Sequence, residues 1–237
     1  NTQITAVAWW GFAHLLRSGS IVLFGMYGTV SEIISIDLAN AILFTAFAMT
    51  YTGARVFDGR SINPFALAGG AAVWLLASRT PYIFDSMDAR ILVSSGIITC
   101  YTWCTAYEFW RGRSEPLVSR WPAIFMLFAH GALFLLRTPL TSILPWTNKD
   151  QLYASVWLTV LSFEALLFTI SIAFILLAMA KERTELRHKT AALIDPLTGI
   201  ANRRAFLESA SELFLRQGNS PRPTAVLLID LDHFKSI

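Results

Sequence analysis

"SFEALLFTISIAFILLAMAKERTELRHKTAALIDPLTG", residues 162–199, passes from an apolar run through a charged segment to a turn. A membrane-spanning helix needs about 20 mostly apolar residues, and the part before Lys181 supplies the end of such a run. The charged part consists of good helix formers, with no Gly or Pro until Pro196. Because the residue before a proline is disfavoured in a helix, we expect one helix to leave the membrane and to end before Pro196.

The composition extends this membrane character to most of the chain. Of the 237 residues, 54% are hydrophobic and 15% are charged, whereas a soluble domain has about 25% charged residues. We therefore expect an integral membrane protein in a lipid bilayer. The net charge of +3 is too small to indicate a nucleic-acid partner. About six stretches approach the length of a span, at 5–27, 38–56, 63–78, 90–110, 120–136 and 154–178.

The Lys and Arg residues beside these stretches predict the orientation, because basic residues favour the cytoplasmic side. The connections "ARVFDGRS" and "RGRSEPLVSR", with "KERTELRHK" after the last span, are rich in Lys and Arg. The alternate connections hold only Arg79, Arg90, Arg137 and Lys149. This pattern predicts a multi-pass membrane protein with both ends of the stretch inside. The chain begins with Asn and stops within a motif, so we expect a fragment.

Four polar side chains fall within the predicted spans, where ionised groups are costly and often functional. His14 and Arg17 are three residues apart on one helix face, His130 lies in the fifth span and Glu164 in the last. One interpretation is a pocket that senses protons or an unknown ligand, with Arg17 paired to Glu164. The other is that these groups hydrogen-bond neighbouring helices or reach the interface. Two isolated histidines without ligand spacing do not indicate a metal or haem.

The segment after the last span offers half of a coiled-coil pattern. Met179, Leu186 and Leu193 recur every seven residues, while the intermediate positions are polar. Such a pattern fits a short parallel dimer, and it equally fits a solvated helix whose cations face anionic headgroups. Both interpretations stay open.

The remaining residues read as the start of a soluble α/β domain. Asp195 is placed to accept hydrogen bonds from the amides of the following turn, and Asn202 is a good N-cap. The helix expected from Asn202 to Gly218 has one apolar stripe, formed by Phe206, Leu207, Ala210, Leu213 and Phe214. "TAVLLID" then predicts a buried strand that ends in Asp230 and Asp232. Two carboxylates at a strand end can hold Mg²⁺ that is shared with substrate phosphates.

"DPLTGIANRRAF" (195–206) and "LLIDLDHFKSI" (227–237) resemble the opening and the first core strand of the GGDEF domain of diguanylate cyclases. The resemblance implies a palm-like α/β fold, two copies of which meet and condense two GTP molecules into cyclic di-GMP and pyrophosphate. It assigns Mg²⁺ (or Mn²⁺) to the Asp230 carboxylate and the Leu231 carbonyl, with Asp232 as a further candidate. It places Phe234 and Lys235 at the triphosphate. The domain-entry motif comprises Asp195, Leu197, Thr198, Gly199, Asn202 and Arg203.

The expected organisation is an all-α polytopic membrane bundle of about six spans followed by the start of an α/β GGDEF domain. With the resemblance, we expect residues 1–180 to form the sensory region in the bacterial inner (cytoplasmic) membrane, 181–194 a helical connector, and 195–237 the first part of a cytoplasmic GGDEF domain. The connector and this domain are expected to form a homodimer. The GG[DE]EF turn and the guanine-contacting Asn-Asp are not among the residues present, so the fragment alone is expected to be inactive. The alternatives are a catalytically degenerate signalling module and a transporter with a regulatory domain.

Overall fold

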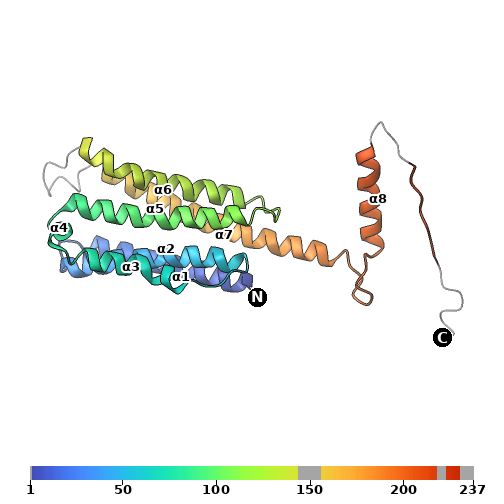
Figure 1. Cartoon of the computed structure of the whole chain (residues 1–237), viewed down its shortest axis with the longest axis horizontal. Coiled ribbons are helices and arrows are strands. Elements are labelled where there is room, and N and C mark those ends of the chain that lie inside the picture. Colours follow the sequence, from blue (N-terminus) through green and yellow to red (C-terminus); the bar gives the residue numbers. More distant parts are fainter. Residues whose placement is uncertain (1, 144–155, 218–222, 230–237) are drawn as a thin grey trace. The chain divides into compact units, whose positions relative to one another are not determined.

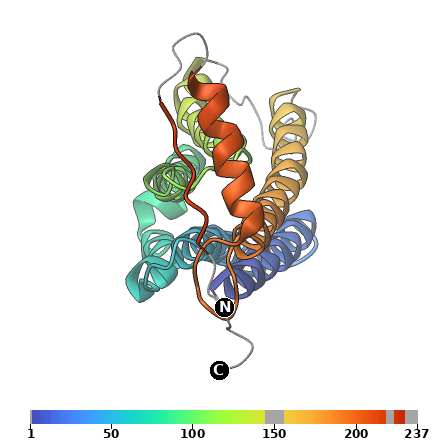
Figure 2. The same cartoon turned by 90° about the vertical axis from the view of Figure 1, so that its right-hand side faces the viewer.

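The computed structural model describes residues 2–143, 156–217 and 223–229. The chain divides into two units, residues 1–183 and residues 184–237, and each is described by itself. The first unit is a helical bundle, in which α1–α3 lie on one side and α5 and α6 on the other (Figure 1). Its elements are α1 Thr2–Gly25, η1 Ile33–Leu38, α2 Ala39–Phe57, α3 Pro64–Ala77, α4 Pro81–Phe84, α5 Met87–Arg111, α6 Arg120–Ile143 and α7 Val156–Ala191. Seen end-on, α7 runs beside α1 (Figure 2).

Local sequence signals account for where several helices begin. The α3 helix starts at Pro64, whose fixed φ suits a first turn, and the Asn63 side chain caps it by accepting from the amides of Phe65 and Ala66. The helix over the stretch predicted at 63–78 thus begins at this proline. Ser86 caps α5 in the same way, through the amide of Ala89.

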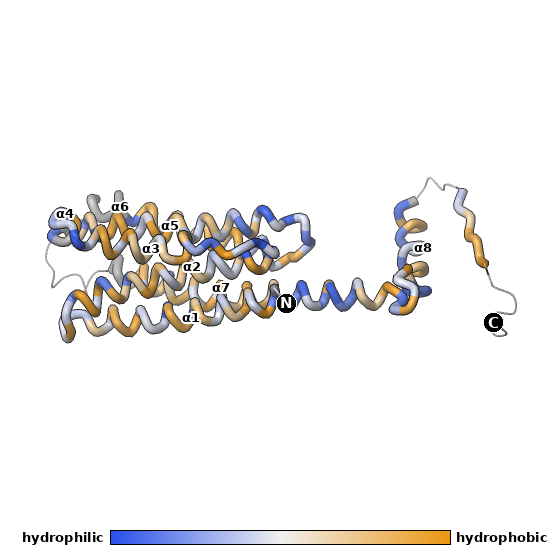
Figure 3. The backbone as a smooth tube through the Cα atoms, turned by 60° about the horizontal axis from the view of Figure 1, so that its bottom comes forward, coloured by the Kyte–Doolittle hydropathy of each residue, from blue (hydrophilic) through white to orange (hydrophobic). Residues whose placement is uncertain are grey.

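Helices form over all six stretches that the sequence predicted as spans. Within the described residues, however, only three helical segments are both long and apolar enough to cross a membrane, Thr2–Gly25, Ile33–Phe57 and Thr159–Ala191. The α3 helix is apolar, but its 14 residues would cover only about 21 Å at 1.5 Å per residue. The predicted count of six spans is therefore not confirmed, although the hydropathy of the bundle is high along most of its length (Figure 3).

Aromatic side chains fill the space between α1, α2 and α5. Trp10 is buried, and its ring packs at centroid distances of 5.3 Å from Phe57 and 6.2 Å from Phe109. The Trp10 indole N–H donates to the carbonyl of Thr50 at 3.3 Å. Gly53 allows this approach, because a Cβ there would lie 2.4 Å from the indole nitrogen. A small residue on one helix thus lets a large ring pack on its backbone.

The described part of the second unit comprises the end of α7, a loop, α8 Arg203–Gln217 and residues 223–229. The predicted strand does not form in the described residues 223–229, which carry no regular secondary structure. Val226, Leu227, Leu228 and Ile229 are exposed instead of buried. A strand is stabilised by hydrogen bonds to a neighbouring strand, and the described residues contain only isolated bridges. The apolar pattern predicted a buried strand, but a strand is buried only when a neighbouring element covers it.

Candidate functional site

The domain-entry motif folds into a closed loop that begins with an Asx turn. The Asp195 carboxylate accepts hydrogen bonds from the amides of Leu197 and Thr198 at 3.1 and 2.8 Å, and from the Thr198 hydroxyl at 2.8 Å. The backbone amide of Gly199 donates to the carbonyl of Asp195, and Gly199 has φ +71°, a conformation that favours glycine. The sequence D-x-L-T-G therefore specifies the shape of this turn.

The other end of the loop is closed by Asn202. Its amide side chain donates to the carbonyl of Ala192 at 2.9 Å, while its Oδ1 accepts from the amide of Ala205 at 3.1 Å and caps α8. Its backbone amide donates to the carbonyl of Leu193. The predicted N-cap is thus confirmed, and the same residue also ties the start of α8 to the end of α7. Arg203 is the first residue of α8 and is exposed.

The hydrogen bonds also explain the acidity of Asp195. The amide and the hydroxyl of Thr198, followed by the amide of Leu197, hold the pKa of the Asp195 carboxyl below its usual value. This lowered pKa keeps the Asp195 carboxylate ionised in neutral solution. These contacts give Asp195 a structural role at the entrance of the domain.

The residues predicted to hold metal and phosphate lie outside the described residues. They are Asp230, Leu231, Asp232, Phe234 and Lys235. Across residues 2–143, 156–217 and 223–229, no group of three or more His, Cys, Asp or Glu side chains could hold a metal ion. The assignment of these residues to Mg²⁺ and GTP therefore stays a prediction.

Within the bundle, His130 and Glu164 come together from α6 and α7. His130 Nδ1 lies 2.8 Å from Glu164 Oε1, and the His130 side chain is only 3% exposed. The imidazole also stacks on Phe168, with 3.7 Å between ring centroids. Two of the four predicted polar groups thus form one hydrogen-bonded pair between the bundle and its last helix.

The predicted pairing of Arg17 with Glu164 is wrong for the described structure. Arg17 is 4% exposed, and its guanidinium lies over the rings of Phe47 and Phe168, at 4.6 and 5.6 Å from the centroids. Its Nε and Nη1 atoms have no hydrogen-bond partner among the described residues. The carboxylate is taken by His130 instead, and the spacing along one helix could not show which residue of another helix it faces. The His14 side chain makes no hydrogen bond or ion pair in the described part of the chain.

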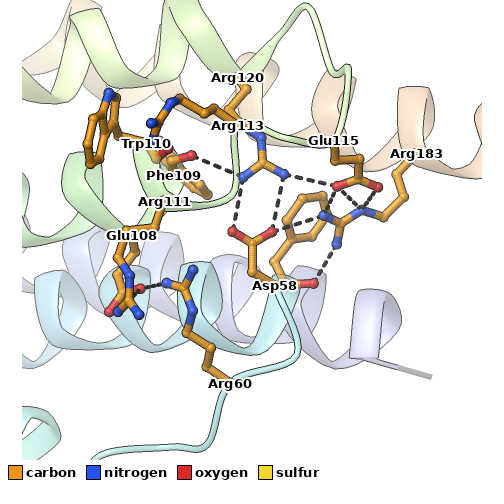
Figure 4. Close-up of polar contacts among 11 residues, drawn as sticks. Asp58, Arg60, Glu108, Phe109, Trp110, Arg111, Arg113, Glu115, Arg120 and Arg183 are labelled. Atoms are coloured by element: carbon orange, nitrogen blue, oxygen red, sulfur yellow. Dashed lines mark hydrogen bonds and ion pairs between the residues drawn. The ribbon is translucent and has the colours of Figure 1, made fainter.

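Sequence reasoning missed a buried ionic cluster where two connections meet α7 (Figure 4). We call Asp58, Glu115, Arg120 and Arg183 the Asp58 cluster. Arg120 holds Asp58 with two hydrogen bonds, Nη1 to Oδ2 at 3.0 Å and Nη2 to Oδ1 at 3.2 Å. The same guanidinium bonds to Glu115 Oε2 at 3.0 Å, and it is 1% exposed. The α2–α3 and α5–α6 connections are therefore joined by one arginine.

Arg183 joins α7 to the same carboxylates. Its Nε donates to both oxygens of Glu115, at 2.8 and 3.1 Å, and its Nη2 donates to Asp58 Oδ1 at 3.0 Å. Its Nη1 donates to the carbonyl of Phe57, and its guanidinium lies 3.3 Å above the ring of that residue. Arginine suits this position because its planar fork can bond several acceptors at once. The outcome is a buried connection between both loops and the last helix.

A second arginine-rich group lies next to it around Glu108. This carboxylate is 4% exposed and pairs with Arg55 at 2.8 Å, with Arg60, and with Arg111 at 3.8 Å. The sequence did contain a sign of these ionic groups, because each of the basic connections holds an acid among its basic residues. The orientation argument counted only Lys and Arg, and therefore these acids were not considered.

Glu182, beside Arg183, adds a further contact to the α5–α6 connection. Its carboxylate accepts from the amides of Val118 at 2.6 Å and Ser119 at 3.0 Å, directly before α6. Anionic groups are favoured at the start of a helix, where amides are unpaired. Consecutive residues of α7 therefore bind the same connection through opposite charges.

The structure also limits the predicted heptad. Met179 is completely buried in the bundle. Leu186 is half-buried and Leu193 is more exposed than Met179. Since Met179 packs inside the bundle, the seam available to a second copy is shorter than the three-residue pattern suggested.

Comparison with known families agrees with the C-terminal motif. Residues 192–237 match the family model described as "Diguanylate cyclase, GGDEF domain". The C-terminal segment is therefore part of a GGDEF domain, and the resemblance seen in the sequence is confirmed. The match begins one residue after α7 ends at Ala191. No curated protein and no solved structure matches the chain.

Proposed function

We propose that the chain belongs to a membrane-bound diguanylate cyclase, which condenses two GTP molecules into cyclic di-GMP and pyrophosphate. The observation that carries the proposal is the GGDEF match at 192–237, directly after a helix that continues without interruption from an apolar segment. On this proposal the domain is cytoplasmic, and the membrane helices supply the regulatory input.

The proposed reaction requires two domains in a defined arrangement. Each GTP 3′-hydroxyl attacks the α-phosphate of the other, and pyrophosphate leaves. Two copies held by the connector would align the attacking hydroxyl with the phosphorus, which lowers the entropic part of the barrier. Phe234 and Lys235 would lie at the triphosphate, where the Lys235 ammonium offsets negative charge.

The donor set at the end of the chain suits Mg²⁺ (or Mn²⁺). Asp230 supplies a carboxylate, Leu231 a backbone carbonyl, and Asp232 a further carboxylate two residues away. These are the oxygen ligands that hard divalent cations prefer. When bound, the cation would neutralise charge that develops on the phosphate oxygens.

The Asp58 cluster supports a route from the membrane to the enzyme. Arg183, the last residue of the first unit, binds both of its loops, and α7 continues for two more turns to Ala191. We infer that a shift of α7 within the bundle changes these contacts. The change would then reach the arrangement of two GGDEF domains through the end of the helix.

The test of the proposed function is Asp230→Ala in the complete protein. We expect cyclic di-GMP synthesis to be abolished while the amount of protein in the membrane fraction is unchanged. Asp88→Ala, at the exposed start of α5, is the control and should retain synthesis. Product formation by the Asp230 variant at the wild-type rate would reject the metal assignment. GTP binding without any product in the wild type would favour a degenerate signalling module instead.

A further inference from the structure

The guanidinium of Arg17 is an unusual group to find at the centre of this bundle. It is 4% exposed, and Nε and Nη1 have no acceptor among the described residues. Its neighbours are the faces of Phe47 and Phe168, on α2 and α7. Aromatic faces attract a cation but do not accept its N–H hydrogen bonds as an anion does. A buried, ionised arginine of this kind calls for an anionic partner.

The nearby carboxylate does not supply that partner. Glu164 Oε1 is engaged by His130 at 2.8 Å, and Glu164 Oε2 has no hydrogen-bond partner among the described residues. When the pair carries one additional proton, as imidazole with carboxylic acid or as imidazolium with carboxylate, it has no net charge, whereas neutral imidazole beside carboxylate gives it a charge of −1. The local charge formed by Arg17, His130 and Glu164 is therefore +1 when the pair holds this proton and zero when it does not. The protonated pair is the state in which the charge of one bound anion would be neutralised.

The surrounding rings define the rest of the ligand. Phe47, Phe134 and Phe168 all pack against His130, with centroid distances of 5.9, 4.8 and 3.7 Å. Two of these rings also face Arg17. Such a group combines one cation with flat apolar surfaces, and these suit a carboxylate attached to an apolar or aromatic body.

We propose that Arg17, with the His130–Glu164 pair and these three phenylalanines, binds an apolar monocarboxylate inside the bundle. The carboxylate accepts hydrogen bonds from the guanidinium, and the apolar body packs on the rings. Glu164 and Phe168 are four residues apart on the face of α7 that meets this group, so the ligand would contact the helix that leads to Arg183. That the ligand acts as the regulatory signal rests on the proposed function, whereas its binding does not.

The experiment uses benzoate as the probe and benzamide as its uncharged analogue, because the two have nearly the same size and shape. The purified protein in lipid nanodiscs is titrated with each compound by calorimetry, and its thermal unfolding is followed. We expect benzoate to bind and to raise the unfolding temperature, and benzamide to bind at least about tenfold more weakly, because it lacks the charge. Equal binding of the two compounds would overturn the proposal.

The variants separate the site from general effects of the compound. Arg17→Gln should lose benzoate binding, and Arg79→Gln, a variant of a largely exposed arginine, should bind like the wild type. If Arg17→Gln does not fold, Arg17→Lys keeps the charge but not the fork and should weaken binding. Phe168→Ala should also weaken it. Unchanged affinity in both Arg17→Lys and Phe168→Ala would reject this site. Because binding is measured directly, a failure here is distinct from an absence of cyclase activity.

Discussion

At the scale of single residues, the chain depends on a few side chains that satisfy several partners at once. Arg120 and Arg183 share the carboxylates of Asp58 and Glu115. Asn202 bonds both to the end of α7 and to the start of α8. Buried charges are tolerated when their hydrogen bonds are complete, and removal of one partner leaves the others unsatisfied. Substitutions at such positions should therefore have effects well beyond the contact removed.

Gly112→Ala should destabilise the first unit although the backbone there suits any residue, with φ −84°. The added Cβ would lie 2.1 Å from Asp58 Oδ2 and 2.2 Å from Arg120 Nη1, so the ion pair must move. We expect a loss of about 1–3 kcal/mol, typical of overpacking. Thermal unfolding in detergent would measure it. Gly96→Ala, where nothing lies within 4 Å of the new Cβ, should be neutral or stabilising, and a similar loss in both variants would contradict the argument.

The loop at Asp195 should depend on pH. In the folded loop, the Thr198 and Leu197 donors lower the pKa of the Asp195 carboxyl. Ionisation of this carboxyl therefore favours the folded loop. This contribution is fully present above the unfolded pKa of about 3.9 and is lost as the pH falls through the lower, folded value. Hydrogen exchange of the 196–202 peptide, corrected for intrinsic rates, should rise on acidification and in Asp195→Ala at neutral pH. Glu208→Ala in α8 is the control and should leave exchange of the 196–202 peptide unchanged. If this control raised exchange as much as Asp195→Ala does, the turn at Asp195 would not be what protects the peptide.

At the scale of elements, the sequence predicted the positions of the helices better than the contacts between them. Long apolar runs specify a helix locally, and helices formed over all six expected stretches. The motif D-x-L-T-G with Asn202 also specified its own loop, because each hydrogen bond joins residues close in sequence. In contrast, the pairing of Glu164 with His130 rather than Arg17 depends on helix rotation. The strand predicted over "TAVLLID", residues 224–230, needs a neighbouring strand to form, and no sequence period reveals one.

The continuity of α7 predicts an effect of helical phase. Inserting two alanines between Arg187 and His188, after the contacts of Arg183, would rotate the rest of the helix by about 200°, whereas seven alanines restore the phase to within about 20°. We expect the first variant to lose most cyclic di-GMP synthesis and the second to retain it. Both should reach the membrane in equal amounts. If the two insertion variants synthesised cyclic di-GMP at the same rate, the connector would act as a flexible link, and the rotational phase of the helix would not matter.

At the scale of the whole molecule, the proposed function would require the helices of the first unit to influence the GGDEF segment through α7. Within the described residues, the Asp58 cluster binds this helix through several hydrogen bonds of Arg183. The acids within the basic connections could have suggested such a cluster. The sequence could not show which residues meet in it, because its members are separated by up to 125 positions. Its charges thus connect elements of the first unit, a role that the prediction of membrane orientation did not consider.

Arg183→Ala should weaken both stability and output. Arg120 would still pair with both carboxylates, so we expect a loss on the order of 2 kcal/mol, below that of a completely broken buried pair. Glu182 would still hold the α5–α6 connection, but α7 would lose its bonds to both carboxylates of the cluster, and cyclic di-GMP synthesis by the complete protein should fall. Thermal unfolding and product assays would measure the two effects. Arg187→Ala, one turn further on and exposed, should change neither; wild-type stability of the Arg183 variant would show that the cluster does not hold α7.

The uninterrupted α7 also has the geometry of a lever with Arg183 as its fulcrum. Glu164 lies about 28 Å from that point along the helix axis, and Ala191 about 12 Å beyond it, at 1.5 Å per residue. A stiff helix that pivots there would move its outer end in the direction opposite to its inner end. The ratio of the two arms reduces each sideways displacement to roughly two-fifths. On the proposed function, small motions around His130 and Glu164 would therefore arrive at the end of α7 reversed and diminished, and the domain that follows would have to respond to shifts of less than 1 Å for each ~2 Å at that pair.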